Sequence, residues 1–121
     1  MDITEIVELR NNHRLLRRAF FTDPRYVKDD MTVSSFAFTL RKGETGLSVD
    51  IEHLTSYGKS IQDPVRFRLF AVSVELVRSI GLDCAHKPMP ENVAHAEIFG
   101  NPFNKRKSSL LAKNAVYINF P

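Results

Sequence analysis

The residues best suited to chemistry lie in two short stretches, Cys84-Ala85-His86 and His95-Ala96-Glu97. Residues two apart on a β-strand share one face, so each stretch would present its two polar side chains together. If the stretches pair as antiparallel strands with matching faces, Cys84, His86, His95 and Glu97 converge in the tetrahedral arrangement that zinc prefers. The alternative is that Cys84 is a small buried hydrophobe and His95 a hydrogen-bonded strand residue.

The same histidine supports a second hypothesis, in which His95 is a general base and Glu97 the carboxylate that orients it. No nucleophile is evident from motifs, because the sequence has no G-x-S-x-G elbow, no P-loop and no G-x-G-x-x-G fingerprint. The Pro-Cys-x-x-Cys element that would complete a zinc deaminase site is also absent. We therefore expect no cofactor, and the catalytic candidates are limited to His95 and Glu97.

Basic residues cluster in two places and suggest contact with phosphates. Arginines between positions 10 and 18 recur at helical spacing and would form one stripe on a helix, and a second group follows residue 104. The candidate nucleic-acid contacts are Arg10, Arg14, Arg17, Arg18, Lys105, Arg106 and Lys107. The net charge of +3 permits a polyanionic partner without requiring one, so a merely solvated basic surface is the alternative.

Length and composition limit the class of protein to which the chain can belong. The chain has 121 residues, of which 43% are hydrophobic and 26% charged, as expected for one globular domain spanning residues 1–121. Cys84 is the single cysteine, which excludes an internal disulfide, and no secretory leader is evident at the N-terminus. We therefore expect a cytoplasmic protein. No stretch approaches the roughly 20 apolar residues that span a bilayer, so no membrane association is expected.

The first half of the chain predicts a helix and a hairpin. Asp2 and Glu5 have capping-box spacing and precede a helical pattern, which predicts an N-terminal helix from about Ile3. A strand beginning within residues 16–21 is the alternative for the later part of this segment. Residues 33–40 and 47–52 both alternate between apolar and polar side chains around a loop with two glycines, which predicts a β-hairpin over Thr32 to Glu52.

The second half is ambiguous in one place. Residues 62–82 fit either one long helix or a strand at residues 67–72 followed by a short helix at 74–80, and we favour the second. Strands are predicted at 82–86 and 93–99, a helix at 105–115 and a closing strand at 116–120. The fold class is therefore α+β, a single compact domain with a mostly antiparallel sheet, an N-terminal helix and one or two further helices.

Three stretches resemble a group of small uncharacterised bacterial proteins: Val33-Ser34-Ser35-Phe36-Ala37-Phe38, Leu47-Ser48-Val49-Asp50, and Val77-Arg78-Ser79-Ile80-Gly81-Leu82 followed by Glu91-Asn92-Val93-Ala94-His95-Ala96-Glu97-Ile98. The resemblance covers most of the chain after Phe20 and implies an intact bacterial domain, without an established activity. It draws attention to Arg18, Ser35, His95 and Glu97. An Arg, a strand Ser and a later Glu are also polar elements of one class of ADP-ribosyltransferase toxins, although the Glu-x-Glu element of that class is missing.

Two functions from different classes follow. The first is a non-catalytic binding module that docks to a partner protein or to RNA through basic and aromatic surface. The alternative is a small hydrolase or transferase, toxin-like in character, that uses His95 and Glu97. The enzyme hypothesis requires both side chains to lie in one concave pocket with a third polar group.

Overall fold

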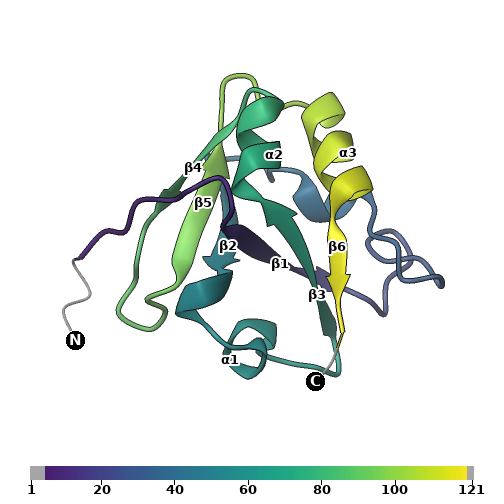
Figure 1. The fold of residues 1–121 in the computed structure, drawn as a ribbon. Coiled ribbons are helices and arrows are strands. Elements are labelled where there is room, and N and C mark those ends of the chain that lie inside the picture. The colour runs from purple at the N-terminus through teal and green to yellow at the C-terminus, as the bar shows by residue number, and fades with distance from the viewer. Residues whose placement is uncertain (1–4, 120–121) are drawn as a thin grey trace.

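The computed structural model describes residues 5–119. Its α+β fold contains a six-stranded antiparallel sheet in the order β4-β5-β2-β1-β3-β6 (Figure 1). The strands are Arg14–Phe20 (β1), Leu47–Ile51 (β2), Phe67–Ser73 (β3), Asp83–His86 (β4), His95–Phe99 (β5) and Val116–Ile118 (β6). The helices are Tyr57–Ile61 (α1), Val74–Ser79 (α2) and Lys105–Asn114 (α3), with 3-10 turns at Ser35–Phe38 (η1) and Glu52–Leu54 (η2).

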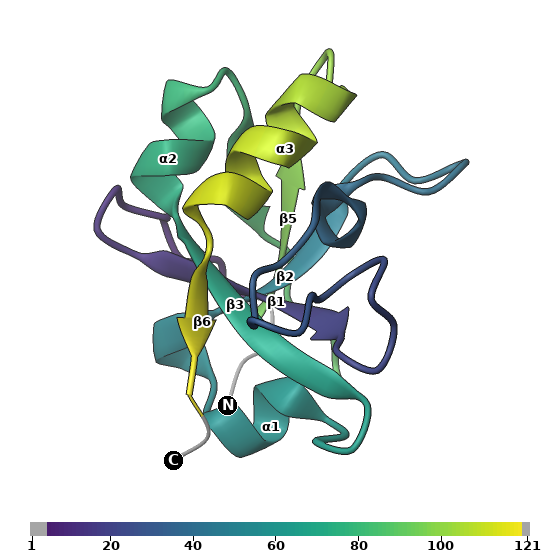
Figure 2. The same cartoon turned by 90° about the vertical axis from the view of Figure 1, so that its right-hand side faces the viewer.

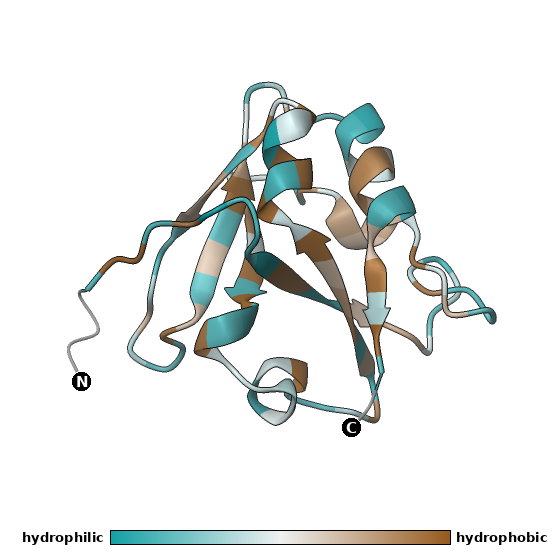
Figure 3. Cartoon of the chain, in the orientation of Figure 1, coloured by the Kyte–Doolittle hydropathy of each residue, from teal (hydrophilic) through white to brown (hydrophobic). Residues whose placement is uncertain are grey.

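Helices cover both faces of this sheet (Figures 1 and 2). The larger core lies where α2, α3 and η1 pack on one face, and it includes Val77, Leu111 and Phe38. A smaller cluster lies on the opposite face, where Ile61 of α1 packs against Leu16 and neighbouring side chains of β3. Hydrophobic residues accordingly run through the central strands β1 and β3 (Figure 3). The faces are named below as the α2/α3 face and the α1 face.

The helices are short, and α3 with ten residues is the longest of those described. Within residues 5–119, none has the length and apolar character needed to cross a bilayer.

The fold class predicted from the sequence is confirmed for the single α+β domain and its antiparallel sheet.

The second half of the chain follows the sequence prediction closely. Residues 62–82 contain a strand and then a short helix, because Ser73 ends β3 and its hydroxyl accepts a hydrogen bond of 3.0 Å from the Leu76 amide as the N-cap of α2. The predicted strands at 82–86 and 93–99 are β4 and β5, and they pair with each other. The predicted helix and closing strand are α3 and β6; position 120 of that strand lies outside the described residues.

The predicted N-terminal helix is not found. Positions 3 and 4 lie outside the described residues, residues 5–13 form no helix, and Arg14 already begins β1. The main chain of this segment is held by distant partners, since Val7 donates to the His86 imidazole and Leu9 accepts from the Arg78 guanidinium. These contacts replace the local hydrogen bonds of a helix. The alternative expectation, a strand beginning within residues 16–21, is confirmed by β1, which begins two residues earlier, at Arg14.

The predicted hairpin over Thr32 to Glu52 is also wrong in its first half. Residues 47–51 do form β2, but its partners are β1 and β5, and residues 35–38 form η1. The Ser34 hydroxyl caps η1 by accepting from the Phe36 amide, and the adjacent residues Ala37 and Phe38 are both buried. Burial of two neighbours suits a 3-10 turn and not a strand with one solvated face.

Candidate functional site

His95 and Glu97 lie on the α1 face of β5, opposite Asp50 and Ser48 of β2. The Nδ1 atom of His95 is 2.8 Å from the Lys87 carbonyl oxygen, and its Nε2 is 3.3 Å from the Ser48 hydroxyl. Because a carbonyl only accepts, Nδ1 carries the proton in the neutral ring, which leaves Nε2 to accept from Ser48. The carboxylate of Glu97 does not orient this imidazole in the structure and instead lies 3.2 Å from the Lys87 ammonium.

This arrangement has two of the three features that the enzyme hypothesis requires. His95 and Glu97 share a face, and Ser48 supplies a third polar group that a neutral imidazole can deprotonate. Neither of the two pockets described below is lined by Ser48, His95 or Glu97. The geometry therefore offers a nucleophile and a base without showing where a substrate would sit.

The four predicted zinc ligands do not converge. Cys84 pairs with Ile98 and His86 with Ala96, which places both side chains on the α2/α3 face, whereas His95 and Glu97 occupy the other face. Among residues 5–119, no three His, Cys, Asp or Glu side chains are grouped to hold a metal ion. Burial also raises the pKa of the Cys84 thiol to about 11, which disfavours the thiolate that zinc binds. The strand register thus contradicts the zinc hypothesis.

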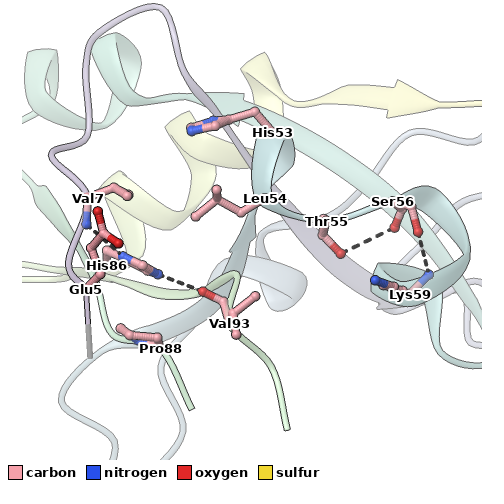
Figure 4. A pocket seen from close by; sticks show the side chains of 10 residues that line it. All are labelled: Glu5, Val7, His53, Leu54, Thr55, Ser56, Lys59, His86, Pro88 and Val93. Atoms are coloured by element: carbon pink, nitrogen blue, oxygen red, sulfur yellow. Dashed lines mark hydrogen bonds between the residues drawn. The ribbon is translucent and has the colours of Figure 1, made fainter. Parts of the chain in front are cut away.

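His86 has a structural role beside a pocket of about 540 Å³ (Figure 4). Its Nδ1 accepts from the Val7 amide at 3.0 Å, so Nε2 carries the proton and donates to the Val93 carbonyl at 2.7 Å. Leu54 and Pro88 also line this pocket, which lies between the N-terminal segment, η2 and the loop at 87–94. With both ring nitrogens engaged, His86 anchors the N-terminal segment to that loop.

The predicted basic stripe does not form, because three of its arginines lie on the strand β1 and not on a helix. Because β1 is extended, Arg14 and Arg18 lie on the α1 face and Arg17 on the other. Arg14 is paired with Glu52 through two hydrogen bonds of 2.9 and 2.5 Å. Arg10, Lys105 and Arg106 are exposed, and Arg10 lies far in the sequence from the other two, which begin α3. Lys107 is only 8% exposed and donates to the Pro102 carbonyl at 2.8 Å, so it is not available as a phosphate contact.

Three arginines do meet in one place, a pocket of about 290 Å³ beside the C-terminal end of β1, which we call the arginine pocket. Arg17 and Arg18 line it from β1, and Arg41 from the loop after η1. Its aromatic walls are Phe20, Tyr26 and Phe67. Guanidinium groups beside aromatic rings form an environment suited to an anion that carries a planar ring.

Arg17 is the innermost of these cations. Its Nε donates to the Ala37 carbonyl at 2.7 Å and its Nη1 to the Ser48 carbonyl at 2.8 Å, and it makes no ion pair with a carboxylate in residues 5–119. Burial, followed by the charges of Arg18 and Arg41, lowers the pKa of Arg17 to about 10, although Glu44 partly opposes this. An anion in the pocket would relieve both effects.

Arg18 is held by a buried carboxylate. Its Nη1 lies 3.2 Å from Asp50, which is only 2% exposed, and also donates to the Ser60 carbonyl at 2.8 Å. Asp50 further accepts from the Ser60 hydroxyl at 2.7 Å and from the Asn92 amide at 2.8 Å. This cluster joins β1, β2, α1 and the loop at 87–94, and it fixes one guanidinium at the rim of the arginine pocket.

Four aromatic side chains form a row that starts in the arginine pocket. The ring centroids of Phe67 and Phe20 are 4.7 Å apart, those of Phe20 and Tyr26 5.7 Å, and those of Tyr26 and Phe36 6.0 Å. Phe36, at the end of this row, is 57% exposed. We call Phe67, Phe20, Tyr26 and Phe36 the aromatic row.

Neither Arg41, Ser48 nor Asp50 was a predicted site residue. Ser48 and Asp50 are recognisable only once the register of β2 with β5 is known, and Arg41 is a lone exposed arginine in a loop. No family model, curated protein or solved structure matches this chain. Its function must therefore be argued from the geometry of these sites.

Proposed function

We propose that the protein is a non-catalytic binding module for single-stranded RNA, which it contacts through the arginine pocket and the aromatic row. The observation that carries the proposal is the Arg17 guanidinium, partly buried among two other cations without a carboxylate partner in the described chain. Burial of a charge is unfavourable unless something compensates it, and an RNA phosphate would do so.

The aromatic row favours single-stranded RNA over a double-stranded nucleic acid as the ligand. Unpaired bases stack on exposed aromatic side chains, whereas the bases of a duplex are covered by their neighbours. Phe36 continues the row outside the pocket and offers a partly exposed ring surface. Phosphates on the arginines and bases on the rings would therefore engage one strand in two ways.

Fluorescence anisotropy with a short labelled single-stranded RNA across a salt series tests this proposal. We expect affinity to fall with salt, and Arg41→Gln to reduce the slope of log affinity against log salt by about 0.7, the value for one phosphate contact on a single strand. Lys42→Gln is the matched control, because Lys42 is also exposed, carries the same charge and does not line the pocket. Affinity that ignores salt would contradict a phosphate-led mode and favour docking of a partner protein.

A second pair of variants tests the aromatic row. Phe36→Ala removes the exposed ring, and we expect a loss of about 1–3 kcal/mol in RNA binding, the range for one stacked base. Val65→Ala is the control, because Val65 is 74% exposed and is not part of the row. Equal affinities of the two variants and the unaltered protein would argue against stacking on Phe36.

The enzyme alternative, a small hydrolase or transferase, has one observation in its favour, the hydrogen bond between Ser48 and the imidazole of His95. In that function Ser48 would attack an acyl or phosphoryl group and His95 would take its proton. The bond to the leaving group would then break as His95 passes the proton to it, with the Lys87 carbonyl orienting the ring. Treatment with a fluorophosphonate probe followed by peptide mass spectrometry tests it. Labelling of Ser48 that is lost in His95→Gln is the expected result for an enzyme, and an unlabelled Ser48 would reject it.

A further inference from the structure

We infer that the arginine pocket binds the terminal phosphate of the RNA strand, a phosphate monoester at the 5′ or 3′ end, in preference to the phosphates within the strand. The inference rests on the proposed function and names the group that this site recognises. It follows from the charges that line the pocket, its size and the position of the aromatic row.

The charges favour a dianion. Arg18 is already paired with Asp50, but Arg17 and Arg41 make no ion pair with any carboxylate between residues 5 and 119. The nearby Glu44 partly offsets the charge of Arg17, but its carboxylate accepts a hydrogen bond of 2.6 Å from the Arg41 main chain and forms no ion pair with either guanidinium. A phosphate monoester carries about −1.5 to −2 charges at pH 7, whereas each diester within a strand carries one. Two guanidinium groups without an ion pair in residues 5–119 therefore match the monoester better.

The donors are also suited to phosphate. A guanidinium has five N–H groups in a planar fork that fits phosphate oxygens in pairs. Arg17 directs its Nε to Ala37 and its Nη1 to Ser48, which fixes the plane of the group and leaves its other donors for a ligand. Within residues 5–119 nothing anchors the Arg41 side chain in the same way; it is exposed and can close over a bound anion from the rim.

The size of the pocket favours a strand end. Its volume of about 290 Å³ is near the lower limit of pockets for small molecules, about 300 Å³. A pocket of this size can take the terminal nucleotide of a strand, which has only one chain connection to place outside it. Because Phe20, Tyr26 and Phe67 line the pocket and Phe36 follows outside, a strand whose end lies on the arginines would place its next base towards Phe36.

The experiment compares three single-stranded RNAs of one sequence and length, with a 5′ phosphate, a 3′ phosphate or hydroxyl groups at both ends. Anisotropy is measured at one salt concentration, with the fluorophore within the strand. We expect one of the phosphorylated strands to bind at least about tenfold more tightly than the hydroxyl-ended strand, as two charge-assisted contacts imply. The arm with the higher affinity identifies the end that the pocket takes.

Arg41→Gln should remove most of this preference, whereas Lys42→Gln should retain it. Equal affinity for all three strands, with binding that still depends on salt and on Arg41, would overturn the terminal-phosphate inference while leaving RNA binding in place. Absence of binding to all three would overturn both. A preference for a phosphorylated end that survives Arg41→Gln unchanged would place the terminal phosphate outside the arginine pocket and reject the inference.

Discussion

The Arg17 guanidinium donates a hydrogen bond of 2.8 Å to the main-chain oxygen of Ser48, across the point where β1 and β2 separate. The two strands pair through Leu15 with Ile51 and Leu16 with Asp50, and the ladder does not continue beyond them. The Arg17 side chain therefore links β1 to β2 where their main-chain hydrogen bonds have ended. The same bond holds its charge at the arginine pocket, so one residue serves both the sheet and the candidate site.

Arg17→Lys tests what the Arg17 hydrogen bonds contribute to the stability of the sheet. Lysine keeps the positive charge, but one ammonium cannot reproduce the planar fork that reaches the Ala37 and Ser48 carbonyls together. We expect the free energy of unfolding, measured in urea, to fall by about 1–2 kcal/mol because one buried carbonyl loses its donor. Arg41→Lys, at an exposed position, should stay within about 0.5 kcal/mol. Unaltered stability of Arg17→Lys would show that the bridge between β1 and β2 is dispensable.

Asp50→Asn tests the cluster that holds Arg18. Asp50 accepts from Arg18, Ser60 and Asn92, and an asparagine would present an NH₂ group to one of these donors while leaving Arg18 without its counter-charge. We expect a loss of about 3 kcal/mol in urea denaturation, as for the breaking of a buried ion pair. Asp29→Asn changes the same charge at an exposed position and should lie within about 0.5 kcal/mol. Similar stabilities of the two variants would contradict a structural role for Asp50.

Local signals determined the parts of the fold that were predicted correctly. The β-branched and aromatic run at 67–72 favoured a strand, and a capping serine at its end allowed a helix to follow at once. Alternation failed at residues 33–40, where the spacing of Phe36 and Phe38 imitated a strand. There the conformation depends on a distant contact, since Ser108 of α3 donates to the Phe38 carbonyl at 2.9 Å. A pattern within ten residues carries no information about that partner.

The candidate site was also predictable only from neighbouring residues, and not from contacts between distant parts of the chain. Arg17 and Arg18 were selected from the sequence for their charge, but as part of a helical stripe, and the structure instead places them on opposite faces of β1. The arginine pocket exists because β1 and β2 diverge and the loop carrying Arg41 returns to them. The His95 and Glu97 pair was correctly expected to share a face, whereas its partner Ser48 required the register of β2 with β5. Spacing along one strand was predictable, and pairing between strands was not.

The ion pair of Arg14 and Glu52 predicts a small pH dependence of stability. The hydrogen bond from Arg14 lowers the pKa of Glu52 below its ordinary value of 4.5. The carboxylate therefore stabilises the fold above about pH 4.5, and this contribution is lost as the pH falls through the lowered pKa. Both side chains are about 40% exposed, so Glu52→Gln should cost only about 0.5 kcal/mol at pH 7. Urea denaturation at a series of pH values should show the difference disappearing in acid, and a difference that stays constant would contradict this ion pair.

The Cys84 thiol should be unreactive in the folded protein. Its burial on the α2/α3 face raises its pKa to about 11, chiefly through loss of hydration, so almost none is present as the nucleophilic thiolate near pH 8. We expect a thiol-specific disulfide reagent to modify the native chain far more slowly than the chain unfolded in urea, where the ordinary pKa returns. The rate should rise with urea in parallel with unfolding, because modification then requires opening of β4 against the core. Modification at the same rate in native and unfolded protein would place Cys84 at the surface and contradict its burial on the α2/α3 face.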